Sequence, residues 1–445
     1  MSLPLRAPRV AFRVLVVLLA VALMGPLGLV GGAQQPVFRS TVELMAVDVQ
    51  VVDQKGQPIG QLGPDAFEVS INGKKRRVVS AQFVQHRARS AVATGGFAMA
   101  GAVPAPGMDA GTPARTVIVA VDAGSFTPGD IQAATEAASQ FIRRLGPDDQ
   151  VGLFVYPRVS WIAPTTQRAA LGVRLANLTG QKEPLRGRFN LSPHEIVDIT
   201  AQATNPNSFL MTGSGGGLGR RGQMRQAASS AGLDPVLKIQ ARECPGDANL
   251  DCAHQIYSEG LGLATQLERE AHDSLSGLDA LLRVLAEMPG RKAVVLVTGG
   301  LLVSDRLDGR PDPGTAARAM GQAAARANAT IYTIQIDSTS SFAGRAARRS
   351  RGETDLARDR ALLGNWLEAF SRSAGGQRIE VPVGGGEFAF DRVLSETSAY
   401  YLLGVEPADA DRDGRPRKLS VKVDGRGLTV RSRQWVLVPP RTRRS

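Results

Sequence analysis

The sequence is poor in the residues on which most catalytic and metal sites depend. Its 445 residues include two cysteines, and aromatic residues make up only 5%. The four histidines, His86, His194, His254 and His272, form no paired motif. Neither a Gly-Lys-Ser/Thr phosphate loop nor a Gly-x-Ser-x-Gly nucleophile elbow occurs. The motifs thus give no support to nucleotide hydrolysis or serine hydrolysis, and only a hydrolase with an unrecognised site stays open.

The bulk composition predicts a globular protein with a basic surface. Hydrophobic residues make up 43% of the chain and charged residues 21%, which excludes a disordered chain, and the length suits two or three domains. The formal charge is +12. No basic helix with interleaved aromatic residues occurs, so the sequence does not indicate a nucleic-acid partner.

The first 33 residues have the pattern of a secretory signal peptide. Arg6, Arg9 and Arg13 precede an apolar stretch over 14–30, which small residues follow at 31–33. We therefore expect residues 1–33 to be removed and the mature protein to be periplasmic or secreted. The alternative is an uncleaved anchor in the inner membrane, because the apolar stretch nearly reaches spanning length.

The N-terminal part of the mature chain predicts β structure. Residues 37–88 form a predicted β module, and residues 89–114, rich in Ala, Gly and Pro, form a predicted linker. The expected strands cover 42–52, 67–71 and 77–84. Asn72-Gly73 between the last two is a strong signal for a β-hairpin.

Residues 115–397 alternate strands and helices, which predicts an α/β fold with a doubly wound, mostly parallel sheet. Strands are expected at 116–122, 151–156, 292–298, 329–336 and 377–381, and helices at 128–145, 166–178, 251–288, 313–328, 357–373 and 386–397. An insertion covers 180–250, in which Ser192-Pro-His-Glu195 has the form of a helix-capping box.

Residues 398–438 predict β structure again, with strands at 400–405, 419–423 and 428–438. Each terminal β segment has too few strands to form a sandwich alone. We therefore expect 398–438 to pair with 37–88 in one accessory β-sandwich, with the α/β domain between them in the sequence.

Cys244 and Cys252 are the only cysteines. In an exported chain they are expected to form one local disulfide. Two free or metal-binding thiols are the alternative, for which His254 is the one nearby histidine.

Several stretches together resemble the VWFA-related domain family of acidobacterial exported proteins, whose domain is von Willebrand factor type A-like. They are 47–53, 61–69, 72–74, 116–122, 146–152, 290–298, 397–404 and 428–431. The two cysteines are also similar to those of the family. The resemblance covers most of the mature chain and implies a Rossmann-type fold and export, but little about biochemistry.

The resemblance also implies a metal site, of which this sequence keeps only part. Type A domains place Asp-x-Ser-x-Ser after the first strand, a threonine on a second loop and an aspartate after the fourth strand. Asp122 matches the first position, but Gly124, Phe126 and Gly299 replace the two serines and the late aspartate. Since Mg²⁺ requires about six oxygen ligands, we expect no metal and no other cofactor.

A rearranged site is the alternative, with Ser125 and a threonine of the 165–166 pair as additional ligands for Mg²⁺. Asp122 itself is interpreted as a strand-end residue that caps the following turn or helix. Asp409, Asp411 and Asp413 match the start of a calcium loop, but Ser420 replaces the glutamate at its twelfth position, which favours a polar hairpin turn.

The sequence therefore favours a non-enzymatic binding or scaffold protein for a protein or envelope component. The candidate binding residues are Asp122, Ser125, Phe126, Trp161 and Gly299, at the edge of the sheet where its parallel strands end. Phe126 and Trp161 are either interface anchors or residues that pack beneath the loops. A divalent-cation-dependent adhesion module is the second hypothesis.

Overall fold

The computed structural model describes residues 43–86, 115–183, 185, 187–203, 235–246, 251–302, 313–337, 352–382, 386–425 and 427–440. The predicted signal peptide 1–33 and linker 89–114 lie outside these residues, as do 204–234 and 247–250 of the predicted insertion. None of the helices in the described ranges is both long and apolar enough to cross a bilayer.

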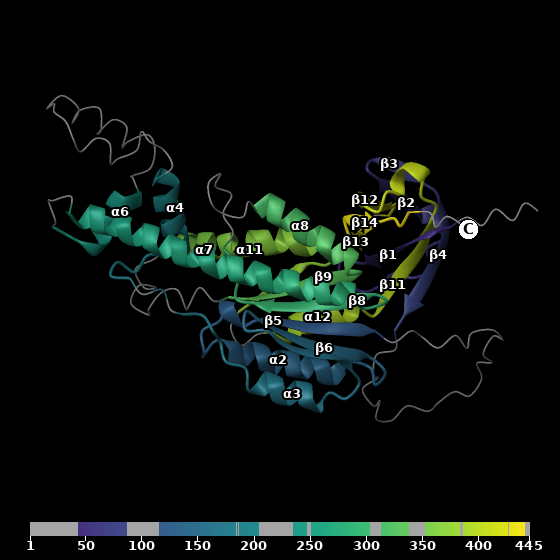
Figure 1. Cartoon of the computed structure of the whole chain (residues 1–445), viewed down its shortest axis with the longest axis horizontal. Coiled ribbons are helices and arrows are strands. Elements are labelled where there is room, and N and C mark those ends of the chain that lie inside the picture. The colour runs from purple at the N-terminus through teal and green to yellow at the C-terminus, as the bar shows by residue number, and fades with distance from the viewer. Residues whose placement is uncertain are drawn as a thin grey trace, which may run out of the picture. The chain divides into compact units, whose positions relative to one another are not determined.

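A six-stranded sheet forms the centre of the α/β part (Figure 1). Its strands are β5 (Thr116–Asp122), β6 (Gln150–Tyr156), β7 (Ser160–Thr165), β8 (Lys292–Thr298), β9 (Ala329–Ile336) and β10 (Arg378–Val381). They follow the order β10-β9-β8-β5-β6-β7, and all neighbours are parallel except β6 and β7. The order reverses between β5 and β8, so the carboxyl ends of these strands flank the topological switch point.

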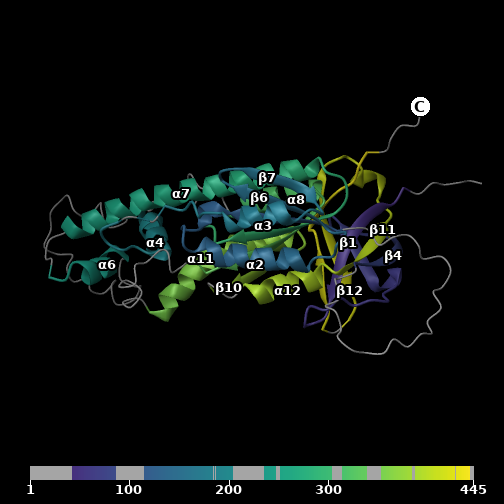
Figure 2. The same cartoon turned by 90° about the horizontal axis from the view of Figure 1, so that it is seen from below.

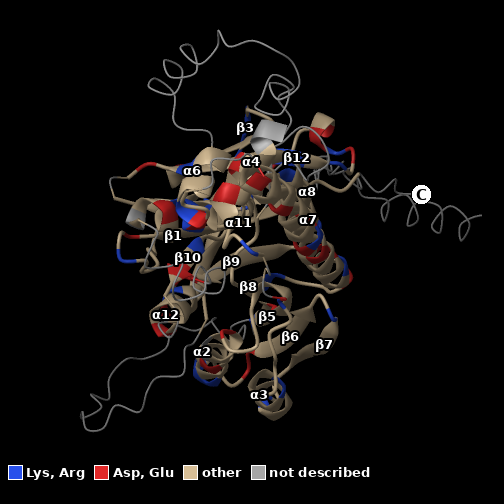
Figure 3. Ribbon diagram, turned by 90° about the vertical axis from the view of Figure 1, so that its left-hand side faces the viewer, with Lys and Arg blue, Asp and Glu red and all other residues tan. Residues whose placement is uncertain are grey.

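The mostly parallel sheet confirms the predicted α/β class, and its strands are apolar because helices cover both faces. One face packs against α2 (Ile131–Arg144), α3 (Ala169–Ala176) and α12 (Glu387–Glu396). The other packs against α7 (Asp251–Ala286), α8 (Pro313–Arg326) and α11 (Glu353–Ser373), as Figure 2 shows from a second direction. Charged residues of both signs lie mainly on the helices rather than the central strands (Figure 3).

Strand β7 was not predicted from the sequence. It is short, contains Pro164 and pairs only with β6 among the described strands, at the edge of the sheet. Proline cannot donate a backbone hydrogen bond, so a central strand excludes it while an edge strand tolerates it. Because β7 is short and contains a proline, its residues gave only a weak indication of a strand.

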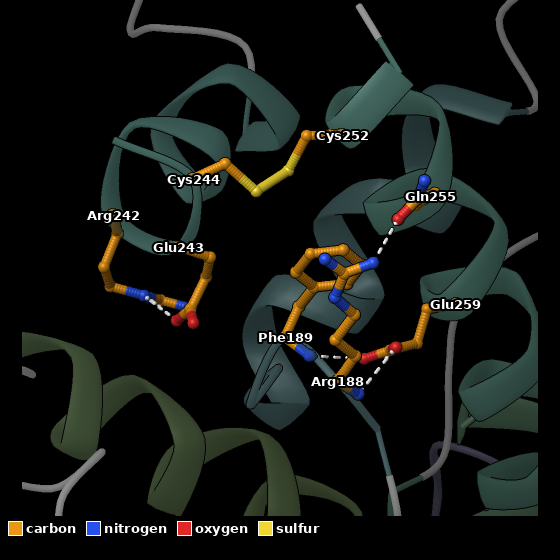
Figure 4. Close-up of a disulfide and its surroundings, with 8 residues drawn as sticks. All are labelled: Arg188, Phe189, Arg242, Glu243, Cys244, Cys252, Gln255 and Glu259. Carbon is orange, nitrogen blue, oxygen red and sulfur yellow. Dashed lines mark hydrogen bonds and ion pairs between the residues drawn. A yellow bond between two sulfur atoms is a disulfide. The ribbon is translucent and has the colours of Figure 1, made fainter. Parts of the chain in front are cut away.

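A helical layer extends from the first half of α7. It includes α4 (Pro193–Ala203) and α6 (Pro235–Glu243), which share a separate hydrophobic cluster with α7. The predicted capping box is present, because Ser192 N donates to Glu195 Oε2 at 2.9 Å. The disulfide between Cys244 and Cys252 is confirmed and joins the end of α6 to the start of α7 (Figure 4).

Two four-stranded antiparallel sheets share one hydrophobic core. One contains β1 (Met45–Val52), β4 (Val78–Gln85), β11 (Ala399–Val405) and β13 (Thr429–Ser432), and the other β2 (Phe67–Ile71), β3 (Lys74–Arg76), β12 (Pro416–Val423) and β14 (Trp435–Leu437). Strand β11 lies between β1 and β4, and β12 pairs with β2. The predicted pairing of the terminal segments is therefore confirmed.

Two details of these sheets differ from the prediction. The Asn72-Gly73 turn, with φ of 49° and 78°, joins β2 to the short β3 rather than to the expected strand 77–84. The chain then crosses to the other sheet as β4. The single strand expected over 428–438 is likewise two strands, β13 and β14, which pair in different sheets.

Candidate functional site

The candidate site lies at the switch point of the six-stranded sheet. Three segments meet there: the turn η2 (Ala123–Ser125) after β5, the loop that follows β8, and residues 180–183. The middle of helix α7 lies beside these three segments and lines the same pocket. Ligands of doubly wound sheets bind in this crevice, outside the carboxyl ends of the strands.

Asp122 is the buried centre of the site, with 2% of its surface exposed. Its Oδ2 accepts a hydrogen bond from Ser274 Oγ and lies 3.2 Å from Thr298 Oγ1. Its Oδ1 is buried and has no hydrogen-bond partner among the described residues. The side chain makes no capping hydrogen bond to η2, which contradicts the predicted capping role; the Gly124 amide lies near the carboxyl and lowers its pKa without meeting hydrogen-bond geometry.

Ser125 and Gly299, two of the predicted site residues, join the loops. Ser125 Oγ donates to Asp122 O at 2.7 Å and accepts from Gly299 N at 2.7 Å. Thr298 Oγ1 lies 3.2 Å from Ser125 Oγ. These short contacts fix the distance between the ends of β5 and β8, so Ser125 and Gly299 hold the site together rather than present groups to a partner.

Backbone contacts place Lys182 beside Asp122. Gln181 N donates to Ala123 O at 2.7 Å, and Lys182 N donates to Phe126 O at 2.9 Å. The chain approaches so closely that a Cβ on Gly180 would lie 2.2 Å from Thr127 O. Only glycine fits there, which brings the lysine side chain into the site.

Helix α7 contributes Ser274 and Glu270, one turn apart. The helix passes close to the sheet at Gly277, where a Cβ would lie 2.4 Å from the Tyr156 ring. This approach lets Ser274, three residues earlier on the same face, reach Asp122. No motif pointed to either residue, because both are in the interior of a long helix.

A pocket of about 480 Å³ opens beside Asp122. Its charged lining residues are Asp122, Glu183, Glu270, Asp273, Lys182 and Arg269. No histidine lines the pocket in the part of the chain that the structure describes. The pocket therefore has acidic groups in excess and a lysine beside the buried aspartate.

Burial shifts the pKa values of the groups in this pocket. It raises the pKa of Asp122 to about 6, against the opposing effects of the Ser274 and Thr298 hydroxyls, the Lys182 charge and the Gly124 amide. Burial also raises the pKa of Glu270 and lowers that of Lys182 to about 8. The Asp122 and Lys182 charges each favour the ionised form of the other, but for both groups burial has the larger effect on the pKa.

Phe126 and Trp161 lie elsewhere. The Phe126 side chain is completely buried in the core between the sheet and α2, so it is not an interface anchor in this structure. Trp161 is half-buried on β7 and packs edge-to-face against Phe154, with ring centroids 6.0 Å apart. Of the two interpretations of these aromatics, packing is the one that the structure bears out.

The suggested threonines do not reach the site either. Thr165 pairs with Val151 at the start of β6, whereas Asp122 pairs with Tyr156 at its end. Thr165 is therefore at the opposite edge of the sheet. Thr298 supplies the hydroxyl instead, and its position at the end of the strand next to β5 could have indicated this.

The donor set does not fit Mg²⁺. Within the described residues, the Asp122 carboxylate contacts the Ser274 and Thr298 hydroxyls. The Ser125 hydroxyl instead bonds to the Asp122 backbone carbonyl, the Gly299 amide and the Thr298 hydroxyl. The described residues contain no group of three or more His, Cys, Asp or Glu side chains arranged to hold a metal. Mg²⁺ in proteins is held by free carboxylate and hydroxyl oxygens together with water, and here all three hydroxyls are already engaged in hydrogen bonds.

Two other polar clusters have structural explanations. Ser192 Oγ and Asp359 Oδ1 both lie 2.9 Å from His194 Nδ1, the same ring nitrogen, so they do not form a Ser-His-Asp relay. Asp411, in the segment that resembles a calcium loop, accepts two hydrogen bonds from Arg76, at 2.6 and 2.8 Å. Its carboxylate therefore has a structural role in a polar turn, which agrees with the interpretation from the missing glutamate.

Comparison with known proteins adds no family assignment: no protein-family model matches the chain, and no curated protein matches it.

Proposed function

We propose that this chain is an exported, non-enzymatic binding or scaffold protein. It receives part of a protein or envelope component in the pocket beside Asp122. The observation that carries the proposal is the buried Asp122 carboxylate at the switch point, whose Oδ1 lacks a hydrogen-bond partner within the described structure while the residue lines a pocket of about 480 Å³. A buried acceptor without a donor is costly, and a donor group on a ligand would satisfy it.

We further propose that the α/β part is von Willebrand factor A-like with a degenerate metal site. In order of appearance along the chain, its sheet has the strand order 3-2-1-4-5-6, and Asp122 ends the first strand. Both features agree with the resemblance of residues 116–122. The lack of a fit to Mg²⁺ supports recognition by the pocket side chains themselves.

Site-specific photo-crosslinking in the native envelope tests this proposal. A photoreactive amino acid replaces Asp273, an exposed residue that lines the pocket, and, as a control, Glu136, an exposed residue of α2 on the other face of the sheet. We expect a discrete adduct from position 273 and none from position 136. No adduct at 273, or the same adduct from both positions, would contradict the proposal.

A divalent-cation-dependent adhesion module is the second candidate. The unpartnered Asp122 Oδ1 and the nearby hydroxyls of Ser125, Ser274 and Thr298 favour it, because such oxygens can bind hard cations. Saturable Mn²⁺ binding in isothermal titration, abolished by Asp122→Asn, would establish this candidate in place of the metal-independent one.

A further inference from the structure

Lys182 is a positively charged residue of the pocket beside Asp122. Lys182 lines both the main pocket and a smaller cavity, and Asp122, Glu270 and Ser274 line the same two. Backbone hydrogen bonds tie its segment to the turn after β5. The backbone of Lys182 is therefore held next to the end of β5, and its side chain starts within the site.

The surrounding charges are arranged around this lysine. Asp122 from β5, Asp130 from the start of α2 and Glu270 from α7 each act on its ammonium, and together they oppose the effect of burial on its pKa. Glu183 and Asp273 act in turn on Glu270. Carboxylates from three separate elements thus lie near enough to Lys182 to favour its charged form.

We propose that Lys182 is the resident cation of this pocket and takes the place that a divalent metal ion would have beside Asp122. The positive charge that compensates the buried Asp122 carboxylate then comes from a side chain of the protein and not from a bound ion. Such an ammonium repels a divalent cation at the same position, and it holds its charge without a ring of oxygen ligands. This inference rests on the proposed function and adds that partner binding does not depend on metal.

Melting temperatures of the mature chain test the proposal. We would compare the wild type with Lys182→Met, which removes the charge but keeps the length, and with Lys238→Met, which removes an exposed lysine of α6. Each protein is stripped with EDTA and then measured with and without 5 mM Mg²⁺ or Mn²⁺, about the millimolar range of weak protein sites.

We expect no metal effect on the wild type or on Lys238→Met. Lys182→Met should melt roughly 5 °C lower, because it leaves Asp122 buried without its counter-charge, and Mn²⁺ should restore part of the loss. In the double variant Asp122→Asn/Lys182→Met, most of the loss and the response to Mn²⁺ should disappear, since no uncompensated carboxylate remains.

Two results would overturn the inference: a wild-type melting temperature raised by Mn²⁺ in a way that Asp122→Asn abolishes, or equal losses in Lys182→Met and the double variant. If Lys182→Met does not fold, the inference is tested by the wild type and by Lys182→Arg, which keeps the positive charge. The melting temperatures of both should not change when Mg²⁺ or Mn²⁺ is added. None of these measurements involves a partner. A negative result here would therefore contradict the role of Lys182 but not the proposed partner binding, and a negative crosslinking result would contradict partner binding but not the role of Lys182.

Discussion

At the scale of single residues, Asp122 is a buried carboxylate at the end of the first strand of the central sheet. The residue stands where the resemblance to type A domains places the first metal ligand, but its neighbours are hydroxyls and a lysine. Burial raises its pKa to about 6. Its charge is therefore sensitive to mild acidification, which leads to a test of the residue itself.

Asp122→Asn should change how stability depends on pH. The unfolded carboxyl titrates near 3.8 and the folded one near 6, so between these values the native state binds more protons and the free energy of unfolding falls as pH rises. This raised pKa corresponds to a loss of up to about 3 kcal/mol in the wild type by pH 7, which the variant lacks.

Urea unfolding of both proteins at pH 4.5 and pH 7 measures this difference. The stability of Asp122→Asn relative to the wild type should improve from the lower to the higher pH. A difference that is the same at both values would show that Asp122 titrates normally in the folded protein.

At the scale of elements, glycines determine which segments can approach the site. Gly180 lets the 180–183 segment contact the turn after β5, and Gly277 lets α7 contact Tyr156. The first half of α7 instead holds the helical layer, where the disulfide and the contacts of Glu259 with the Arg188 and Phe189 amides bind separate segments together (Figure 4).

Removal of the disulfide should loosen that layer only. Cys244→Ser/Cys252→Ser opens a loop of about nine residues, which the chain-entropy model values at about 2.5 kcal/mol. Hydrogen exchange should increase over α6 and the start of α7, and the six-stranded sheet should stay protected. Free thiols in the oxidised wild-type protein, or loss of protection in β5 and β8, would contradict this expectation.

At the scale of the whole molecule, segments from both ends of the chain complete each other. Strand β11 separates β1 from β4 in one sheet, and β12 connects β2 to β14 in the other. In each sheet, the two central strands come from opposite ends of the sequence and pair with each other: β1 with β11, and β2 with β12. The two sheets can therefore form only after the α/β part has been synthesised.

A chain that ends at residue 397 should lose both sheets. Strands β1, β2 and β4 would keep their apolar inner faces and exposed edges without β11 and β12, which favours aggregation. We expect size-exclusion chromatography of the truncated protein to show aggregates, whereas the complete mature chain elutes as a discrete species. A soluble truncated protein with the β content of the full chain would refute this dependence.

The alternation of strands and helices, the disulfide, the capping box at Ser192 and the pairing of the terminal β segments could all be predicted from the sequence. These features depend on local periodicity, on turn residues and on the need of each β segment for partners, all of which a sequence contains. The sequence also located Asp122, Ser125 and Gly299, because the ends of parallel strands meet at one edge.

The residues around Asp122 could not be predicted from the sequence and became apparent in the folded chain. Lys182, Glu270 and Ser274 come from a loop and a helix up to 152 residues away in the chain, and close packing at two glycines brings them together. Tertiary packing also buries Phe126 in the core and places Trp161 against Phe154. Such contacts depend on how elements approach one another in three dimensions, for which neither residue spacing nor hydrophobic periodicity carries a signal.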